Sequence, residues 1–213
     1  QMVASFSFFI IVFYMYQGSY AEAGNWPAWF STVTAIVTAF GVIPIVTLLA
    51  NKFGKRQAFI ISTALSIVGY VLKWWAFDKD NPYLLFMPIP FMAFGLGGLF
   101  TLMMSMTADV CDLDELENGM PRKEGTFGAI YWWMVKLGQA LALVLGGAVL
   151  KFVGFDGNAA QQTAETMTSL RLADVIIPSV TAGLAILVMW SYSLSESRAK
   201  KIKEQLIERR GEL

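Results

Sequence analysis

The chain has 213 residues, of which 56% are hydrophobic and only 15% are charged, and its mean hydropathy is +0.54. Soluble domains usually carry about 25% charged residues, so this composition argues against a soluble enzyme and a disordered tail. Sixteen Lys and Arg balance sixteen Asp and Glu, which leaves no overall basic field for a nucleic acid. The sequence has no His and a single Cys, Cys111, and so lacks the residues of a disulfide framework, a Cys/His zinc site or a Ser-His-Asp triad. We expect an all-α membrane protein that is not an enzyme and has no resident cofactor or metal.

Long apolar runs predict six membrane-spanning helices. A bilayer core about 30 Å thick requires roughly 20 mostly apolar residues in a helix. Six segments meet that requirement: about 2–20, 27–50, 57–77, 82–108, 127–152 and 172–195. The short polar stretches between these segments are typical of loops.

Positive charges are distributed unevenly between the two sides of this arrangement. Most Lys and Arg residues outside the spans fall in the second loop, the fourth loop and the C-terminal segment: Lys52, Lys55, Arg56, Arg122, Lys123, Arg198, Lys200, Lys201, Lys203, Arg209 and Arg210. Only Lys79 and Arg171 fall on the opposite side. Because loops rich in Lys and Arg face the cytoplasm, we expect both termini to be cytoplasmic.

The segment after the sixth span predicts an amphipathic helix. In residues 195–210, one helical face carries Ala199, Ile202 and Leu206, with basic residues around them. Such a helix would lie along the cytoplasmic membrane surface, and a solvated helical tail is the alternative.

Two sets of small residues predict close contacts between helices. The fourth span contributes Gly95, Gly97 and Gly98. The fifth span contributes Gly138, Ala142 and Gly146.

A lysine within the fifth predicted span is the most informative residue. Lys136 lies about ten residues into the span, or about 15 Å along a helix that rises 1.5 Å per residue, and so close to the bilayer centre. A charge at that depth costs about 2.5–3.5 kcal/mol, so such residues usually face a cavity or a partner. Trp132 and Gln139 share its helical face. An amine and an amide can hydrogen-bond sugar hydroxyls while an indole covers an apolar ring face, so this trio predicts a sugar-binding cavity.

The alternative for Lys136 is neutralisation by an Asp on another helix, with a role in packing or gating. A buried Lys needs a carboxylate or an anionic substrate nearby. The predicted spans place no acidic residue of this chain at mid-depth, so we expect any such partner to come from elsewhere.

Other polar residues lie nearer the ends of the spans. Lys73 and Lys151 are close to the outer ends of the third and fifth spans, where we expect them to extend to the interface. Tyr14 and Gln17 in the first span are further candidates for the cavity, and interfacial anchoring is the alternative for the aromatic residues there.

Acidic residues crowd the predicted loop after the fourth span. The loop contains Asp109, Asp112, Asp114, Glu115 and Glu117, followed by Arg122, Lys123 and Glu124. Carboxylates at a helix C-terminus oppose its dipole and so need cations, which the basic loop at residues 51–56 can provide. A solvated acidic loop is one interpretation. The other is an ion-pair gate that breaks and reforms as two halves of a transporter rock.

Two stretches of this sequence together resemble one family of transporters. The run TADVCDLDELENGMPRKEG is followed by YWWMVKLGQAL. This combination is similar to the glycoside–pentoside–hexuronide:cation symporters of the major facilitator superfamily, which show the same order of acidic residues, Gly, Arg, Glu-Gly and a helix with a central Lys. The matching residues here are Ala108, Asp109, Asp112, Glu115, Gly119, Arg122, Glu124, Gly125 and Lys136. The loop LANKFGKR and the ending YSLSESRAKKIKEQLIERR resemble the same family, so the resemblance covers essentially the whole chain.

The resemblance implies one half of a twelve-helix transporter. Residues 1–195 would form a six-helix major-facilitator-type half bundle, equivalent to helices seven to twelve, and residues 196–213 a cytoplasmic amphipathic tail. Lys136 would lie near the sugar and cation sites, with Trp132 also facing the cavity. The cytoplasmic gate would contain Asp109, Asp112, Arg122 and Glu124. Because Arg122 follows Glu115 at one residue more than the usual spacing, the pairing within the gate stays open.

The implied function is symport of a glycoside, oligosaccharide or hexuronide with Na⁺ or H⁺ across a bacterial inner membrane. The family's cation-binding carboxylates and most sugar contacts lie in the N-terminal half. We therefore expect four partners: the sugar, the coupling cation, the lipid bilayer and an N-terminal six-helix half, on the same polypeptide or a second chain. Since Gln1 begins inside an apolar run, we expect the chain to continue a longer polypeptide. The alternatives are the same fold carrying a lysolipid or other amphiphile, and a non-transporting six-helix module that acts as a receptor or assembly scaffold.

Overall fold

The computed structural model describes residues 2–119 and 122–211, and its regular structure in those ranges is entirely helical. The elements in chain order are α1 (Met2–Phe9), the π-helical η1 (Ile10–Met15), α2 (Tyr20–Ala23), α3 (Trp26–Ile36), the π-helical η2 (Val37–Val42), α4 (Ile43–Phe53), α5 (Lys55–Ala76), the 3₁₀ turn η3 (Pro82–Phe86), α6 (Ile89–Asn118), α7 (Glu124–Phe152), α8 (Ala164–Trp190) and α9 (Glu196–Gly211). Residues 1, 212 and 213, the ends of the two predicted segments, lie outside the described residues.

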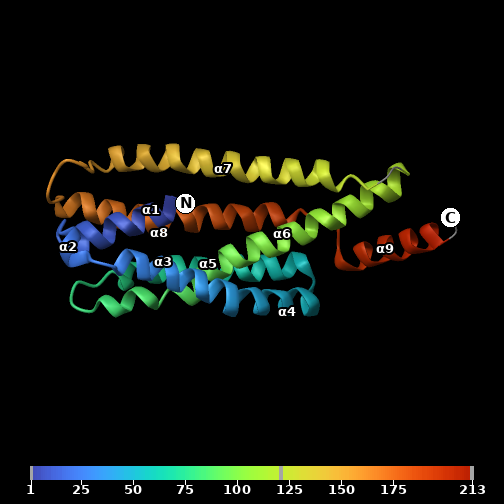
Figure 1. The fold of residues 1–213 in the computed structure, drawn as a ribbon, viewed down its shortest axis with the longest axis horizontal. Helices are drawn as coiled ribbons and strands as arrows, with labels where there is room; N and C mark the ends of the chain where they lie inside the picture. The colour runs from blue at the N-terminus through green and yellow to red at the C-terminus, as the bar shows by residue number, and fades with distance from the viewer. Residues whose placement is uncertain (1, 120–121, 212–213) are drawn as a thin grey trace.

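The helices run along one long axis (Figure 1). We call the end that carries α9 and the turn at Gly54 the α9 end, and the end that carries α2 and the turn before Pro82 the α2 end. α5 packs most extensively against α6 and α8, so these three helices form the centre of the bundle.

Five described helical stretches are long and apolar enough to cross a membrane. They are Tyr20–Phe53, Lys55–Ala76, Pro82–Asn118, Glu124–Phe152 and Ala164–Trp190. The predicted first span, 2–20, is a shorter apolar helix that ends at Met15. It ends because Gln17 and Gly18 both have positive φ, and a Cβ on Gly18 would lie 1.9 Å from the carbonyl oxygen of Ala160. The structure confirms an all-helical membrane protein with these five stretches.

Two predicted helix boundaries are wrong. α6 continues to Asn118 instead of ending near 108, so the predicted acidic loop is largely helical and ends at Gly119, which has a φ of +61°. α8 begins at Ala164 instead of near 172, because the Thr163 hydroxyl caps the helix by accepting a hydrogen bond from the Thr166 amide at 3.2 Å. Polar residues in the last turns of α6 and the first turns of α8 concealed both boundaries in the sequence.

Small residues bring α6 close to its neighbours, as the sequence predicts. A Cβ added at Gly98 would lie 2.8 Å from Ser62 Cβ on α5, and one added at Gly97 would lie 2.8 Å from Val42 Cγ1 on η2. Larger side chains would force these helices apart. The predicted close contact at the small residues of α7 is not seen at Gly138, because a Cβ added there would meet no described atom within 4 Å.

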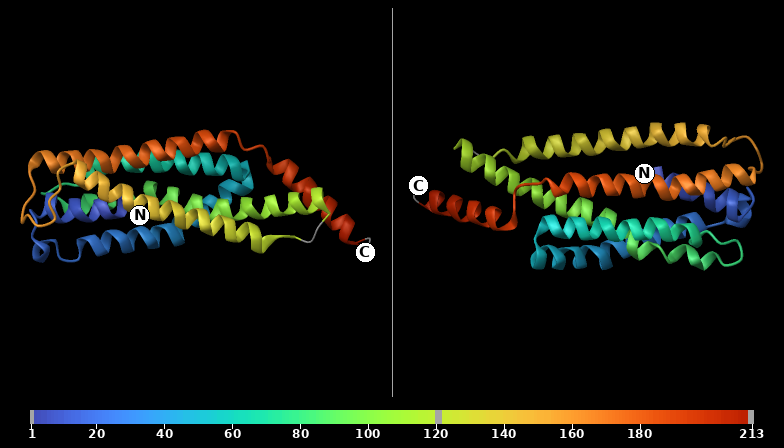
Figure 2. Two further views of the ribbon diagram at one scale, coloured as in Figure 1. Left: turned by 90° about the horizontal axis from the view of Figure 1, so that it is seen from above. Right: turned by 180° about the vertical axis from the view of Figure 1, so that it is seen from behind.

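α7 stands apart from the other long helices (Figures 1 and 2). Gly146 is its one buried residue among those described, whereas Trp133, Leu141 and Val144 are more than half exposed. An apolar surface of this extent marks contact with lipid or another protein.

The C-terminal helix α9 packs on the last turns of α6. Its predicted apolar face is confirmed, since Ala199, Ile202 and Leu206 are buried. Ile202 and Leu206 belong to a cluster that includes Val110 and Leu113 of α6. The prediction that this face lies on the membrane surface is therefore wrong for this structure, because α6 covers it.

Candidate functional site

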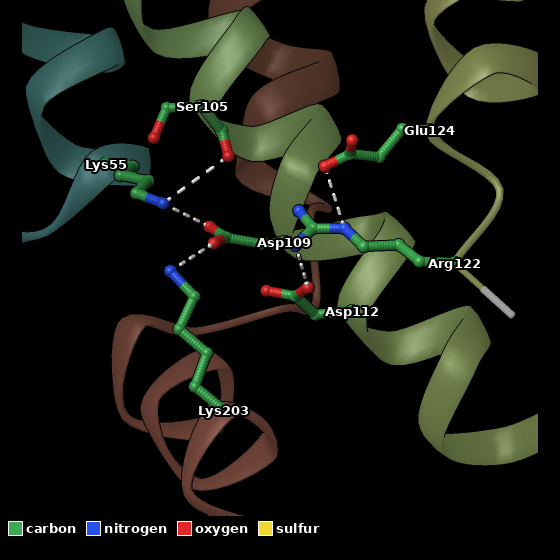
Figure 3. A network of polar contacts seen from close by, with 7 residues as sticks. All are labelled: Lys55, Ser105, Asp109, Asp112, Arg122, Glu124 and Lys203. Carbon is green, nitrogen blue, oxygen red and sulfur yellow. Dashed lines mark hydrogen bonds and ion pairs between the residues drawn. The ribbon is translucent and has the colours of Figure 1, made fainter. Parts of the chain in front are cut away.

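An ion-pair cluster lies at the α9 end of the bundle (Figure 3). Asp109 of α6 is buried and pairs with Lys55 Nζ from the first turn of α5. Its other carboxylate oxygen lies 3.5 Å from Lys203 Nζ of α9. Lys55 also donates a hydrogen bond to the Ser105 carbonyl at 3.4 Å. One carboxylate thus joins three helices that are distant in sequence.

A second group of ion pairs joins α6 to the start of α7. Arg122 contacts Asp112 at 3.2 Å and Glu124 at 2.9 Å (Figure 3). Lys123 contacts Asp114 at 2.9 Å. These contacts establish the pairing that the sequence spacing left open.

Most of the predicted gate residues come together in these two groups. They are Asp109, Asp112, Arg122 and Glu124. Glu115 lies on the same end of α6. The expectation that the basic loop supplies a cation is met by Lys55, whereas sequence reasoning missed Lys203. The apolar face of α9 is the signal that could have found it, because docking this face on α6 brings the basic residues of α9 near the α6 carboxylates.

A hollow of about 600 Å³ lies between α1, α3, α5 and α6, a size within the range of about 300–1,000 Å³ typical of small-molecule sites. Six of its lining residues carry a hydroxyl group, and the others are apolar side chains or Gly; the six are Ser7, Ser31, Thr34, Thr38, Tyr70 and Thr101. The Ser31, Thr34 and Thr38 hydroxyls donate to backbone carbonyls one turn earlier at 2.7–3.1 Å. Their oxygens keep lone pairs that can accept hydrogen bonds from a ligand. The sequence analysis did not identify this wall.

Of the predicted trio on α7, Trp132 lies beside this hollow through an aromatic contact. The Trp132 ring stacks on Phe100 of α6, with 6.5 Å between ring centroids and 25° between planes, and Phe100 lines the hollow. Lys136, one turn further along α7, is exposed and forms no ion pair with any described residue. Gln139 is half-buried on the same helix.

Tyr14 and Gln17, the other predicted cavity residues, lie at the α2 end. The Tyr14 ring is contacted by the Arg171 guanidinium at 4.2 Å and by the Lys79 ammonium at 4.7 Å. Tyr14 and Gln17 line a separate hollow of about 200 Å³ and do not line the larger one. The structure thus does not bring them together with Lys136, and cation–π contacts suit an aromatic anchor near a helix end.

The predicted environment of Lys73 is wrong. The sequence predicts that it extends to the interface, but the structure shows Lys73 wholly buried and paired with Asp174 of α8. Its partner Asp174 is a buried carboxylate that the sequence analysis does not single out. Lys73 is three residues from the end of α5 at Ala76, so the pair lies near the α2 end of the bundle.

Apolar helices of spanning length, a hydroxyl-lined hollow between them and ion pairs at one end together define a multi-pass membrane protein of the transporter class. A family model described as MFS/sugar transport protein matches residues 2–196. The chain belongs to this family, within the glycoside–pentoside–hexuronide:cation symporters of the major facilitator superfamily. Its members here are membrane transporters, not enzymes, and the chain is a multi-pass protein of the bacterial inner membrane.

Several relatives carry names that refer to sugars. The glucuronide carrier protein homolog of Escherichia coli (strain K12) is 27% identical over 83% of this chain and 37% of its own length. The putative sulfoquinovose importer of the same strain is 30% identical over 88% of this chain and 38% of its own length. The isoprimeverose transporter of Lactiplantibacillus pentosus is 25% identical over 73% of this chain and 32% of its own length. The chain therefore spans less than two fifths of the length of these relatives.

Proposed function

We propose that this chain forms the C-terminal, six-helix half of a sugar:cation symporter that works by alternating access. The observation that carries the proposal is the hydroxyl-lined hollow beside Phe100 and Trp132. Hydroxyls on the wall and an indole beside it suit a sugar, whose ring has polar edges and an apolar face, and Lys136 lies one turn from that indole on α7. The relatives, which are named as sugar transporters, favour neither a lysolipid carrier nor a scaffold module.

Two observations support the proposal that the chain is one half of a transporter: the share of its relatives' length that it matches and the exposed apolar surface of α7. The matched region corresponds to 37% and 38% of two relatives, and α7 has an apolar surface that a second half would cover. In this proposal α1 and η1 together are the first of six helices, beside the five apolar stretches. The α9 end, which carries the C-terminal helix, faces the cytoplasm in this proposal, because the basic residues concentrate there.

Within the site, Lys136 and Gln139 hydrogen-bond the sugar and Trp132 stacks on its ring. An acidic sugar fits best, because Lys136 has no ion-pair partner among the described residues. The names of two relatives contain acidic sugars, a glucuronide and sulfoquinovose. The coupling cation is Na⁺ or H⁺, bound by carboxylates of the other half.

The ion pairs around Asp109 and Asp112 serve as the cytoplasmic gate. Asp109 joins α5, α6 and α9, and Arg122 joins α6 to α7. Because these contacts lie within this half, opening of the gate would move α7 and α9 relative to α5 and α6 as the two halves rock.

The test is uptake into bacteria that express the complete reading frame encoding this chain. The probes are radiolabelled sulfoquinovose, a methyl glucuronide and isoprimeverose, each with an imposed Na⁺ or proton gradient. We expect gradient-dependent uptake of at least one probe, and Lys136→Ala should reduce it at least tenfold without lowering the amount of protein in the membrane. The matched control is Lys151→Ala, which removes an exposed lysine near the C-terminal end of α7. This variant should transport normally. Uptake of no probe would refute the transport proposal, and equal uptake by both variants would refute the role of Lys136.

A further inference from the structure

A buried polar cluster connects three helices near the α2 end of the bundle. Lys73 of α5 forms an ion pair with Asp174 of α8, and both side chains have no exposed surface. Lys73 Nζ also donates a hydrogen bond to Ser7 Oγ of α1 at 2.9 Å. The cluster thus ties α1, α5 and α8 together.

Burial of these two charges costs folding free energy that their contacts only partly offset. Removing two charges from water is compensated only when the geometry is good and further hydrogen bonds satisfy the remaining lone pairs. Apart from Lys73, no donor from the described residues makes a hydrogen bond to either carboxylate oxygen of Asp174. An apolar pair of similar volume would stabilise the bundle at least as well, so stability alone does not account for these residues. Ionisable residues inside a membrane span are most often functional.

The cluster reaches the hydroxyl-lined hollow through Ser7. Ser7 contributes to the wall of the 600 Å³ hollow, although it is only 1% exposed. Tyr70, one turn before Lys73 on α5, lines the same hollow. The ion pair therefore lies directly behind the part of the wall where α1 meets α5.

We propose that Lys73 and Asp174 are positioning residues for sugar binding, which hold Ser7 and the α1 wall of the hollow in place. Asp174 orients the Lys73 ammonium, and Lys73 fixes the Ser7 oxygen through a charge-assisted hydrogen bond. This fixes where α1 presents the Ser7 oxygen to the sugar. The inference rests on the proposed transport function.

The experiment compares sugar affinity in variants of the complete transporter. The double variant Lys73→Met/Asp174→Leu replaces the pair by apolar side chains of similar volume, and Ser7→Ala removes the hydroxyl that the pair holds. The triple variant combines them. Ser62→Ala is the matched control, because Ser62 is a buried serine of α5 that does not line the hollow. Uptake of sulfoquinovose, a methyl glucuronide and isoprimeverose is measured as KM and maximal rate, together with the amount of protein in the membrane and its thermal unfolding temperature.

We expect the double variant and Ser7→Ala each to raise KM at least fivefold while the maximal rate changes less than twofold. Ser62→Ala should keep the wild-type KM. The triple variant should be no worse than the double variant, because residues that act through one contact are not additive. A double variant with wild-type KM would overturn the proposal. So would a triple variant whose increase in KM equals the product of the increases in the double variant and in Ser7→Ala. If the double variant does not reach the membrane, Ser7→Ala decides alone, and a wild-type KM for it overturns the proposal. Failure of the wild type to transport any probe would instead refute the proposed function.

Discussion

Two charged regions of the bundle differ in exposure. Lys73 and Asp174 have no exposed surface, and among the described residues each forms an ion pair only with the other. Asp109 at the α9 end instead pairs with two lysines, Lys55 and the half-exposed Lys203. Neither side chain of the first pair has a solvent-exposed surface through which to exchange its contacts, so the pair holds α5 and α8 in a fixed relation. The second region can replace one cation by another or by water at modest cost. Fixed charges suit a wall that must keep its shape, and exchangeable charges suit a gate.

The largest effect should come from breaking the buried pair on one side only. Asp174→Asn leaves Lys73 without a counter-charge in an apolar environment, which costs about 3–5 kcal/mol. We expect much less protein in the membrane and a clearly lower unfolding temperature. Lys73→Met/Asp174→Leu should recover most of that loss because it removes both charges. Equal stability of Asp174→Asn and the wild type would contradict the fixed-pair description.

A smaller effect is expected from Asp109→Asn. The change weakens the contacts with Lys55 and Lys203, and hydrogen bonds to charged groups contribute about 1.5–3 kcal/mol. Because salt screens an exposed charge such as that of the half-exposed Lys203 more than a buried one, the part of the difference between Asp109→Asn and the wild type that comes from Lys203 should shrink at high salt. The corresponding difference for Asp174→Asn should not. Unfolding temperatures at the two salt concentrations check this, and the same salt response in both variants would remove the distinction between the regions.

The smallest effect should come from the pair between α9 and the end of α6. Arg198 and Glu117 are 3.9 Å apart, and both side chains are more than half exposed. Exposed pairs of this kind contribute about 0–1 kcal/mol. Arg198→Ala should therefore unfold close to the wild-type temperature, whereas a loss as large as that of Asp109→Asn would show that α9 depends on this contact.

Much of the fold follows from apolar run length, and part of the site follows from helical spacing. The shared α7 face of Trp132, Lys136 and Gln139 follows from their helical intervals within one span, and its role in binding a sugar stays a prediction. The buried partner of Lys73 could not be predicted, because the polar first turns of α8 resemble a loop and Asp174 then falls at a span end. The hollow was missed for another reason, since its wall depends on how closely Gly97 lets α6 approach η2.

The most direct test of the account is whether a sugar occupies the hollow. Ser31→Cys places a thiol on the wall, and Ser197→Cys places one on the exposed surface of α9. Both are made in a Cys111→Ser background of the complete transporter, and the rate of alkylation by a small maleimide is measured with and without a transported sugar from the three probes. The account predicts that the sugar slows alkylation of Ser31→Cys at least threefold and leaves Ser197→Cys unchanged. Equal rates with and without sugar at Ser31→Cys would contradict the assignment of the hollow as the sugar site.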